Sequence, residues 1–118
     1  MPKVKVLQIS EGTSVSSATD LTLTTVSAKS ADYTLLTTDN IDVILMTTGA
    51  STKTVTLAAA ASSTGRKLTV KKVDSGAGTV VLDGNASETI DGQPTAVITT
   101  QYSFMQIVCD GSNWHIIA

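Results

Sequence analysis

Short apolar runs separated by tight-turn signals are the feature that most constrains the fold of this chain. Residues 67–73 and 79–82 are β-branched or alternating runs, closed by the turn sequences 74–78 and Asp83-Gly84. Glycine reaches the positive φ that tight turns require, and aspartate accepts hydrogen bonds from nearby backbone N–H groups. Turn signals recur about every 8–12 residues, the spacing typical of a sandwich or barrel. The sequence therefore predicts an all-β fold, a small β-sandwich or barrel-like domain of short antiparallel strands, with 76–78 as a hairpin turn.

The composition favours strands over helices. Threonine and serine are abundant, and threonine suits a half-buried pleated surface. Aromatic residues make up only 3%, so the core has to be built from Val, Ile, Leu and Ala. The alanine run 58–62 is too short for a stable isolated helix and predicts at most a single helical turn. A short β-solenoid would space Asp83-Gly84 and Asp91-Gly92 similarly, but this interval is not repeated elsewhere, so the solenoid ranks below the sandwich.

A change in composition near residue 31 divides the chain into two parts. Residues 1–30 are predicted to form an N-terminal arm, and residues 31–118 the β domain. Residues 11–20 are small and polar and cannot bury enough apolar surface to order themselves. An arm of this kind suits pairing with the sheet edge of a neighbouring chain.

The run 41–47 is the most apolar strand candidate, and both of its faces are apolar. Such a strand is either central in a sheet or covered by a partner chain. Small domains with few aromatic side chains often gain stability by oligomerising. The predicted subunit-interface residues are therefore Ile41, Val43, Ile44 and Met46.

Charge and hydropathy exclude two classes of partner. The net charge is −2, and basic residues cluster only at Arg66-Lys67 and Lys71-Lys72, so no nucleic acid is expected. No stretch approaches the roughly 18 apolar residues of a membrane span, and the N-terminus lacks the apolar core of a signal peptide, so no membrane partner is expected.

The residues capable of chemistry do not assemble into a site. His115 is the only histidine, with no metal-ligand spacing around it, so we expect it on the surface. Cys109 lies in an apolar run, which predicts that its thiol is buried and inert. The aspartates at 83, 91 and 110 precede glycines and are expected to cap turns rather than bind calcium. Trp114 is expected in the core. We therefore predict no catalytic residue, no metal and no cofactor, and a protein that is not an enzyme.

An ordered set of short pieces resembles a known family. The set resembles a β-rich domain of tailed-bacteriophage virion proteins, found at the C-terminal end of tail or head fibres and in small capsid-associated proteins. The resemblance covers about residues 31–118. Its pieces are 33–36, 55–58, 65–73, 79–84, 88–92 and 112–117.

The resemblance implies a structural or adhesive virion protein, usually a homotrimer, made in the cytoplasm of the host bacterium. Fibre proteins place a long shaft before this domain, whereas 30 residues precede it here. This difference favours a capsid decoration (cement) protein or a short head spike, with residues 1–30 as the anchor on the major capsid protein or another virion protein. The apolar residues expected to make that anchor are Val4, Val6, Leu7, Ile9, Leu21 and Leu23.

The alternative is the receptor- or sugar-binding tip of a tail fibre. A sugar site would need an exposed aromatic ring near carboxylates, whereas a decoration protein would bury its rings. The rings that distinguish the two hypotheses are those of Tyr33, Tyr102 and Trp114.

Overall fold

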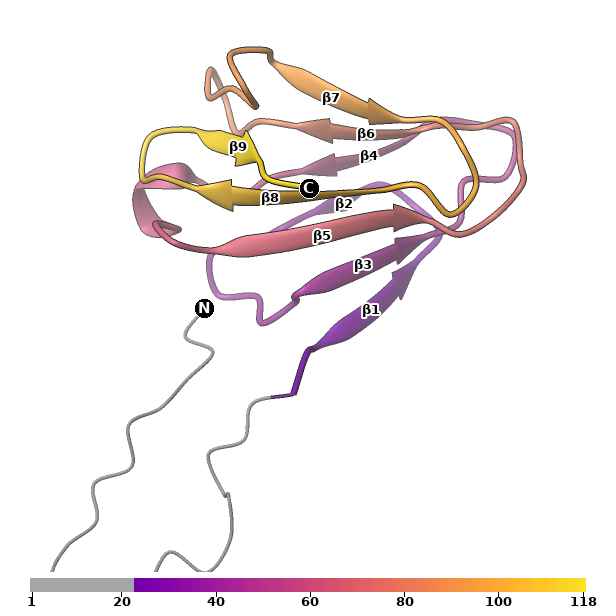
Figure 1. The fold of residues 1–118 in the computed structure, drawn as a ribbon, viewed down its shortest axis with the longest axis horizontal. Helices are drawn as coiled ribbons and strands as arrows, with labels where there is room; N and C mark the ends of the chain where they lie inside the picture. The colour runs from indigo at the N-terminus through magenta and orange to yellow at the C-terminus, as the bar shows by residue number, and fades with distance from the viewer. Residues whose placement is uncertain (1–22) are drawn as a thin grey trace, which may run out of the picture.

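The computed structural model describes residues 23–118, which form a mostly-β fold with a single short 3₁₀ turn (Figure 1). The strand bounds follow the alternating and β-branched runs of the sequence. In chain order the elements are β1 (Val26–Lys29), β2 (Tyr33–Thr34), β3 (Val43–Met46), β4 (Lys53–Thr56), η1 (Ala60–Ser62), β5 (Lys67–Lys72), β6 (Val80–Asp83), β7 (Thr95–Ile98), β8 (Phe104–Cys109) and β9 (Trp114–Ile116).

The strands form two mixed sheets between which the chain passes back and forth (Figure 1). One sheet has the order β1-β3-β5-β8-β9, and the other has the order β2-β4-β6-β7. The first six strands alternate between the sheets. The parallel pairs are therefore β1 with β3, β2 with β4, β3 with β5 and β4 with β6. The ladders β5–β8, β6–β7 and β8–β9 are antiparallel.

The prediction of a mostly-β fold is confirmed, but the predicted antiparallel pairing is correct only for these last three ladders. A turn signal shows where a strand ends and does not show which sheet the next strand joins. For the same reason 76–78 is not a hairpin turn: it lies in the corner between β5 and β6, which belong to different sheets. The regular alternation of β1 to β6 between two sheets, with parallel pairing, is the arrangement expected of a short β-solenoid, which was the alternative prediction. Strands β7, β8 and β9 pair antiparallel and do not follow it.

A single apolar cluster lies between the two sheets and draws side chains from both. Trp114 is fully buried in it, as the sequence predicted. The alternation of β5 places Leu68 and Val70 on the inner face, and strand β3 contributes Ile44 and Met46. The remaining fully or nearly fully buried apolar side chains include Leu35, Val55, Leu57, Val80, Leu82, Ile90 and Ile107.

Strand β1 lies within the range 1–30 that was predicted as an arm. It nevertheless pairs with β3 along four residues, from Val26 opposite Val43 to Lys29 opposite Met46. Because β1 belongs to the five-stranded sheet, the described β domain extends back at least to Val26, five residues before the predicted boundary. β1 is also the edge strand of that sheet.

Replacing Leu82 with alanine tests whether the two sheets share one core. Leu82 is fully buried, so the change should lower the free energy of unfolding by about 2–5 kcal/mol, through lost burial and the cavity left behind. Leu36→Ala is the matched control, because the Leu36 side chain is 54% exposed and should cost less than about 1 kcal/mol. Urea unfolding followed by circular dichroism measures both. Equal losses in the two variants would contradict the assignment of Leu82 to the core.

Candidate functional site

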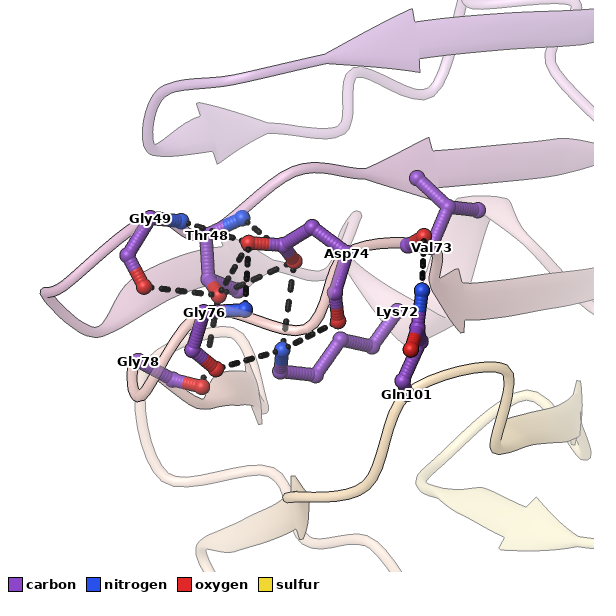
Figure 2. Close-up of polar contacts among 8 residues, drawn as sticks. All are labelled: Thr48, Gly49, Lys72, Val73, Asp74, Gly76, Gly78 and Gln101. Carbon is purple, nitrogen blue, oxygen red and sulfur yellow. Dashed lines mark hydrogen bonds and ion pairs between the residues drawn. The ribbon is translucent and has the colours of Figure 1, made fainter.

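Two corners of the fold, residues 47–52 after β3 and 73–79 after β5, are joined around a buried lysine. The Lys72 side chain is 1% exposed, and Figure 2 shows its ammonium group enclosed by the 73–79 corner. Lys72 Nζ donates to the carbonyl oxygens of Asp74 (2.7 Å) and Gly76 (2.9 Å), and pairs with Asp74 Oδ1 at 3.2 Å. The buried charge is therefore balanced by a carboxylate and two carbonyl dipoles.

The Asp74 carboxylate carries this network across to the 47–52 corner (Figure 2). Asp74 Oδ1 accepts hydrogen bonds from Thr48 N (3.0 Å) and Thr48 Oγ1 (3.1 Å), and Asp74 Oδ2 accepts one from Gly49 N (2.8 Å). These bonds, led by that from the Thr48 backbone N–H, hold the pKa of Asp74 well below its usual value. The carboxylate therefore stays ionised and ties the two corners together.

Two glycines allow the corners to approach each other closely. A Cβ atom on Gly76 would collide with the carbonyl of Gly49, and one on Gly78 would collide with the carbonyl of Ser51. Both obstacles are backbone atoms, which cannot swing aside as a flexible side chain can. These glycines are required by contact between corners, and the corner region is a structural support with its polar groups already paired.

The outer face of the five-stranded sheet carries exposed and half-buried apolar side chains. Val26 is 55% exposed and Phe104 is 54% exposed. Register places Val26 beside Val43, and Leu45 beside Lys71, which in turn lies opposite Phe104. Tyr102, 61% exposed, lies next to them, with Lys71 Nζ 5.6 Å from its ring centroid. We call these residues the apolar face: Val26, Val43, Leu45, Tyr102 and Phe104.

The outer face of the four-stranded sheet has a different character. One row across it runs from Thr34 through Thr56 and Asp83 to Thr95. Val97 is exposed in the neighbouring row, beside half-buried Val81. The molecule therefore presents one sheet face on which apolar side chains surround Lys71, and one that is rich in threonine.

A polar pocket of about 370 Å³ lies at the end of the strands opposite the Lys72 corner, between residues 37–40 and 62–64. Arg66 lines it and bridges its two sides: Nη1 donates to Leu36 O (2.9 Å) and Nη2 to Asp39 O (2.8 Å). Asp39 Oδ2 accepts from the Tyr33 hydroxyl and from Leu36 N. These two hydrogen bonds lower the pKa of Asp39, and the bond from the Tyr33 hydroxyl has the larger effect.

His115 is half exposed, as expected, but it has acidic neighbours that sequence spacing did not indicate. Its Nε2 lies 2.7 Å from Asp110 Oδ2, and its Nδ1 lies 3.8 Å from Asp91 Oδ1. Asp110 also caps its own turn, accepting from the backbone N–H groups of Ser112 and Asn113. Hydrogen bonds lower the pKa of Asp110 to about 2. The bond from the Asn113 N–H has the largest effect, and the bond with His115 has the next largest. Within residues 23–118, no group of three or more His, Cys, Asp or Glu side chains suits a metal ion.

Cys109 is buried, and burial raises the pKa of its thiol, in agreement with the predicted inert cysteine. A thiol with a raised pKa is a poor nucleophile.

The residues predicted for partner contacts are distributed over three environments. Ile44 and Met46 have no exposed surface within the single chain, so they have none to offer a partner, whereas Ile41 and Val43 are partly exposed. Leu23 is 75% exposed. The other predicted anchor residues lie outside the described part of the chain: Val4, Val6, Leu7, Ile9 and Leu21.

Sequence reasoning missed the apolar face as a unit. Its members come from three separate strands and one turn, and only register brings them together. A partial signal existed in the alternation of 102–108, where Tyr102, Phe104 and Val108 share one parity. That parity identifies a face of one strand, but it does not show that strands 26–29 and 43–46 continue it.

Comparison with known proteins does not place the chain in a family. No family model matches it, and no match was found among curated proteins or solved structures. Among the helical residues of the described part, none belongs to a helix long and apolar enough to cross a membrane.

Asp74→Asn tests the corner network through its pH dependence. Because the folded pKa lies below the ordinary value of 3.8, the carboxylate stabilises the fold fully above about pH 4. The stabilisation is lost as pH falls further towards the folded pKa. The urea midpoint of the variant should therefore lie below that of the unaltered protein at neutral pH, and the gap should shrink as pH falls below about 4.

The control is Asp83→Asn, because the Asp83 carboxylate accepts no side-chain hydrogen bond within residues 23–118. The urea midpoint of Asp83→Asn should differ little from that of the unaltered protein at every pH. A gap for Asp74→Asn that stays constant through the acidic range would show that the ionised carboxylate does not hold the corners together.

Proposed function

We propose that the chain is a structural protein of a tailed-phage virion, a capsid decoration (cement) protein or short head spike that assembles as a homotrimer. The observation that carries the proposal is the apolar face on the outer side of the five-stranded sheet. Exposed apolar surface that gathers on one side of a small protein is typical of a protein–protein contact. Here it includes a phenylalanine and a tyrosine, residue types enriched in interfaces.

The edge of the same sheet supports self-association. β1 is the last strand of the sheet, so the backbone groups along its outer side have no partner strand within residues 23–118. An open edge of this kind accepts an additional strand from another chain. Val26 lies on β1 and also belongs to the apolar face, so one partner can cover the edge and the face together.

The paired corners suit a protein whose role is mechanical. A decoration protein contributes stability to a shell by holding a fixed shape between its contacts. Here the shape is fixed by the buried Lys72–Asp74 pair and by glycine contacts between corners. The proposed anchor on the capsid protein is the part of residues 1–30 that precedes β1, of which residues 1–22 lie outside the described region.

The aromatic rings favour this function over the receptor-binding tip. Trp114 is fully buried, and the ring of Tyr33 is covered by Lys29, whose Nζ lies 4.0 Å from the ring centroid. Only Tyr102 among the three candidate rings is largely exposed, and it lies within the apolar face. The charged group near the Tyr102 ring is the Lys71 ammonium, 5.6 Å from the ring centroid, and not a carboxylate, so the ring fits a protein contact better than a sugar platform.

Light scattering coupled to size-exclusion chromatography tests the self-association. The unaltered protein should elute with about three times the 12.2 kDa chain mass. Phe104→Asp should raise the dissociation constant at least about 30-fold, because it places a charge on the apolar face in the position of an exposed aromatic side chain. Val97→Asp, on the outer face of the four-stranded sheet, is the matched control and should leave the mass unchanged. A monomer at every concentration would contradict the proposal.

Removal of residues 1–22 tests the anchor. This cut preserves β1, whereas removal of residues 1–30 would delete an edge strand of the sheet. The shortened protein should keep its circular dichroism spectrum and its oligomeric mass, yet fail to sediment with phage capsids that lack their decoration protein. Cosedimentation equal to that of the full chain would contradict an anchor in this segment.

A further inference from the structure

The polar pocket beside Arg66 has groups that the fold itself leaves unused. Arg66 is 4% exposed, and its Nε has no hydrogen-bond partner. Its other two nitrogens donate to backbone carbonyls, and within residues 23–118 no carboxylate forms an ion pair with it. A buried polar atom without a partner is unusual in a folded protein. Because this Nε has almost no accessible surface, the groups that a ligand can reach are those on the rim of the pocket.

The rim of the pocket is rich in unpaired polar side chains. Thr37, Thr38, Asn40, Ser62 and Thr64 line the pocket and make no side-chain hydrogen bond within the described residues. Four of these side chains end in hydroxyls and one in an amide, so each can both donate and accept a hydrogen bond. The wall is therefore suited to a ligand with many hydroxyl groups.

The charges of the pocket favour a neutral ligand. Asp39 lines the same pocket, and both hydrogen bonds that its carboxylate accepts within the described residues use Oδ2. Oδ1 is left as an acceptor for ligand hydroxyls. The positive charge of Arg66 and the negative charge of Asp39 offset one another at the site. An anion attracted by Arg66 would therefore also be repelled by Asp39.

We infer that this pocket binds a neutral sugar unit at the end of a glycan. A volume of about 370 Å³ is at the lower end of the range for small-ligand sites, and the pocket is open to solvent, so a linked sugar can enter. The Asp39 carboxylate accepts from sugar hydroxyls, while the Asn40 amide and the rim hydroxyls donate and accept. This inference does not depend on self-association, because the pocket lies in loops at the strand ends and shares no residue with the apolar face.

Calorimetric titration of the full chain tests the inference with defined probes. The probes are glucose, galactose, mannose and N-acetylglucosamine, each as the free sugar and as its methyl glycoside, up to about 50 mM, a range that covers millimolar affinities. At least one methyl glycoside should bind, no more weakly than its free sugar, because a glycoside imitates a linked unit. Binding of free sugars alone, or of none of the probes, overturns the inference. Saturable binding of acetate or phosphate that displaces the sugar also overturns it.

Substitutions locate the binding in the pocket. Ser62→Trp should abolish binding by filling the space, whereas Ser75→Trp, on the opposite corner, should leave it unchanged. Asn40→Ala should weaken binding about fivefold through the loss of one hydrogen bond. Circular dichroism and light scattering confirm that each variant is folded and assembled. Sugar binding that persists in Ser62→Trp places the site elsewhere and refutes the assignment, whatever the oligomeric mass of the protein.

Discussion

The buried ammonium group of Lys72 is the centre of the interaction that joins the corner after β3 to the corner after β5, where the chain passes between the two sheets. A desolvated charge is costly unless it is paired and hydrogen-bonded. Here the compensation comes from the Asp74 carboxylate and from the carbonyls of Asp74 and Gly76, and Asp74 in turn binds the backbone of Thr48 and Gly49. The corner after β3 and the corner after β5 are thus held at a fixed separation.

The strand β5 has a buried cation at each end. Lys72 is its last residue, and Arg66 precedes its first. Each cation donates to carbonyl oxygens of the turns around it: Lys72 to the corner that follows β5, and Arg66 to the loop between β2 and β3. The two ends differ in what they leave free. The polar groups around Lys72 are paired, whereas Arg66 adjoins a pocket with several unpaired polar side chains on its rim. This difference is why one end is a structural support and the other is a candidate binding site.

The two sheets also divide the surface into regions with different roles. The outer face of the five-stranded sheet is apolar and adjoins the open edge β1, whereas the outer face of the four-stranded sheet is rich in threonine. The apolar face supports the proposed self-association, and the pocket at the strand ends shares no residue with that face. The proposed self-association and the inferred sugar site therefore rest on separate regions, and each can fail without the other.

The sequence alone determined the strand-rich character of the protein, the turns at Asp-Gly, the buried positions of Trp114 and Cys109 and the end of a strand near Lys72. These follow from local rules: side chains alternate along a strand, and glycine and aspartate favour turns. Only the tertiary structure decided which strands pair, that residues 76–78 form a corner between sheets, and that Ile44 and Met46 belong to the core. It also brought Asp91 and Asp110 to His115, and Asp39 to Arg66. Pairing partners and through-space neighbours depend on how the chain returns to each sheet, and local spacing does not encode that path.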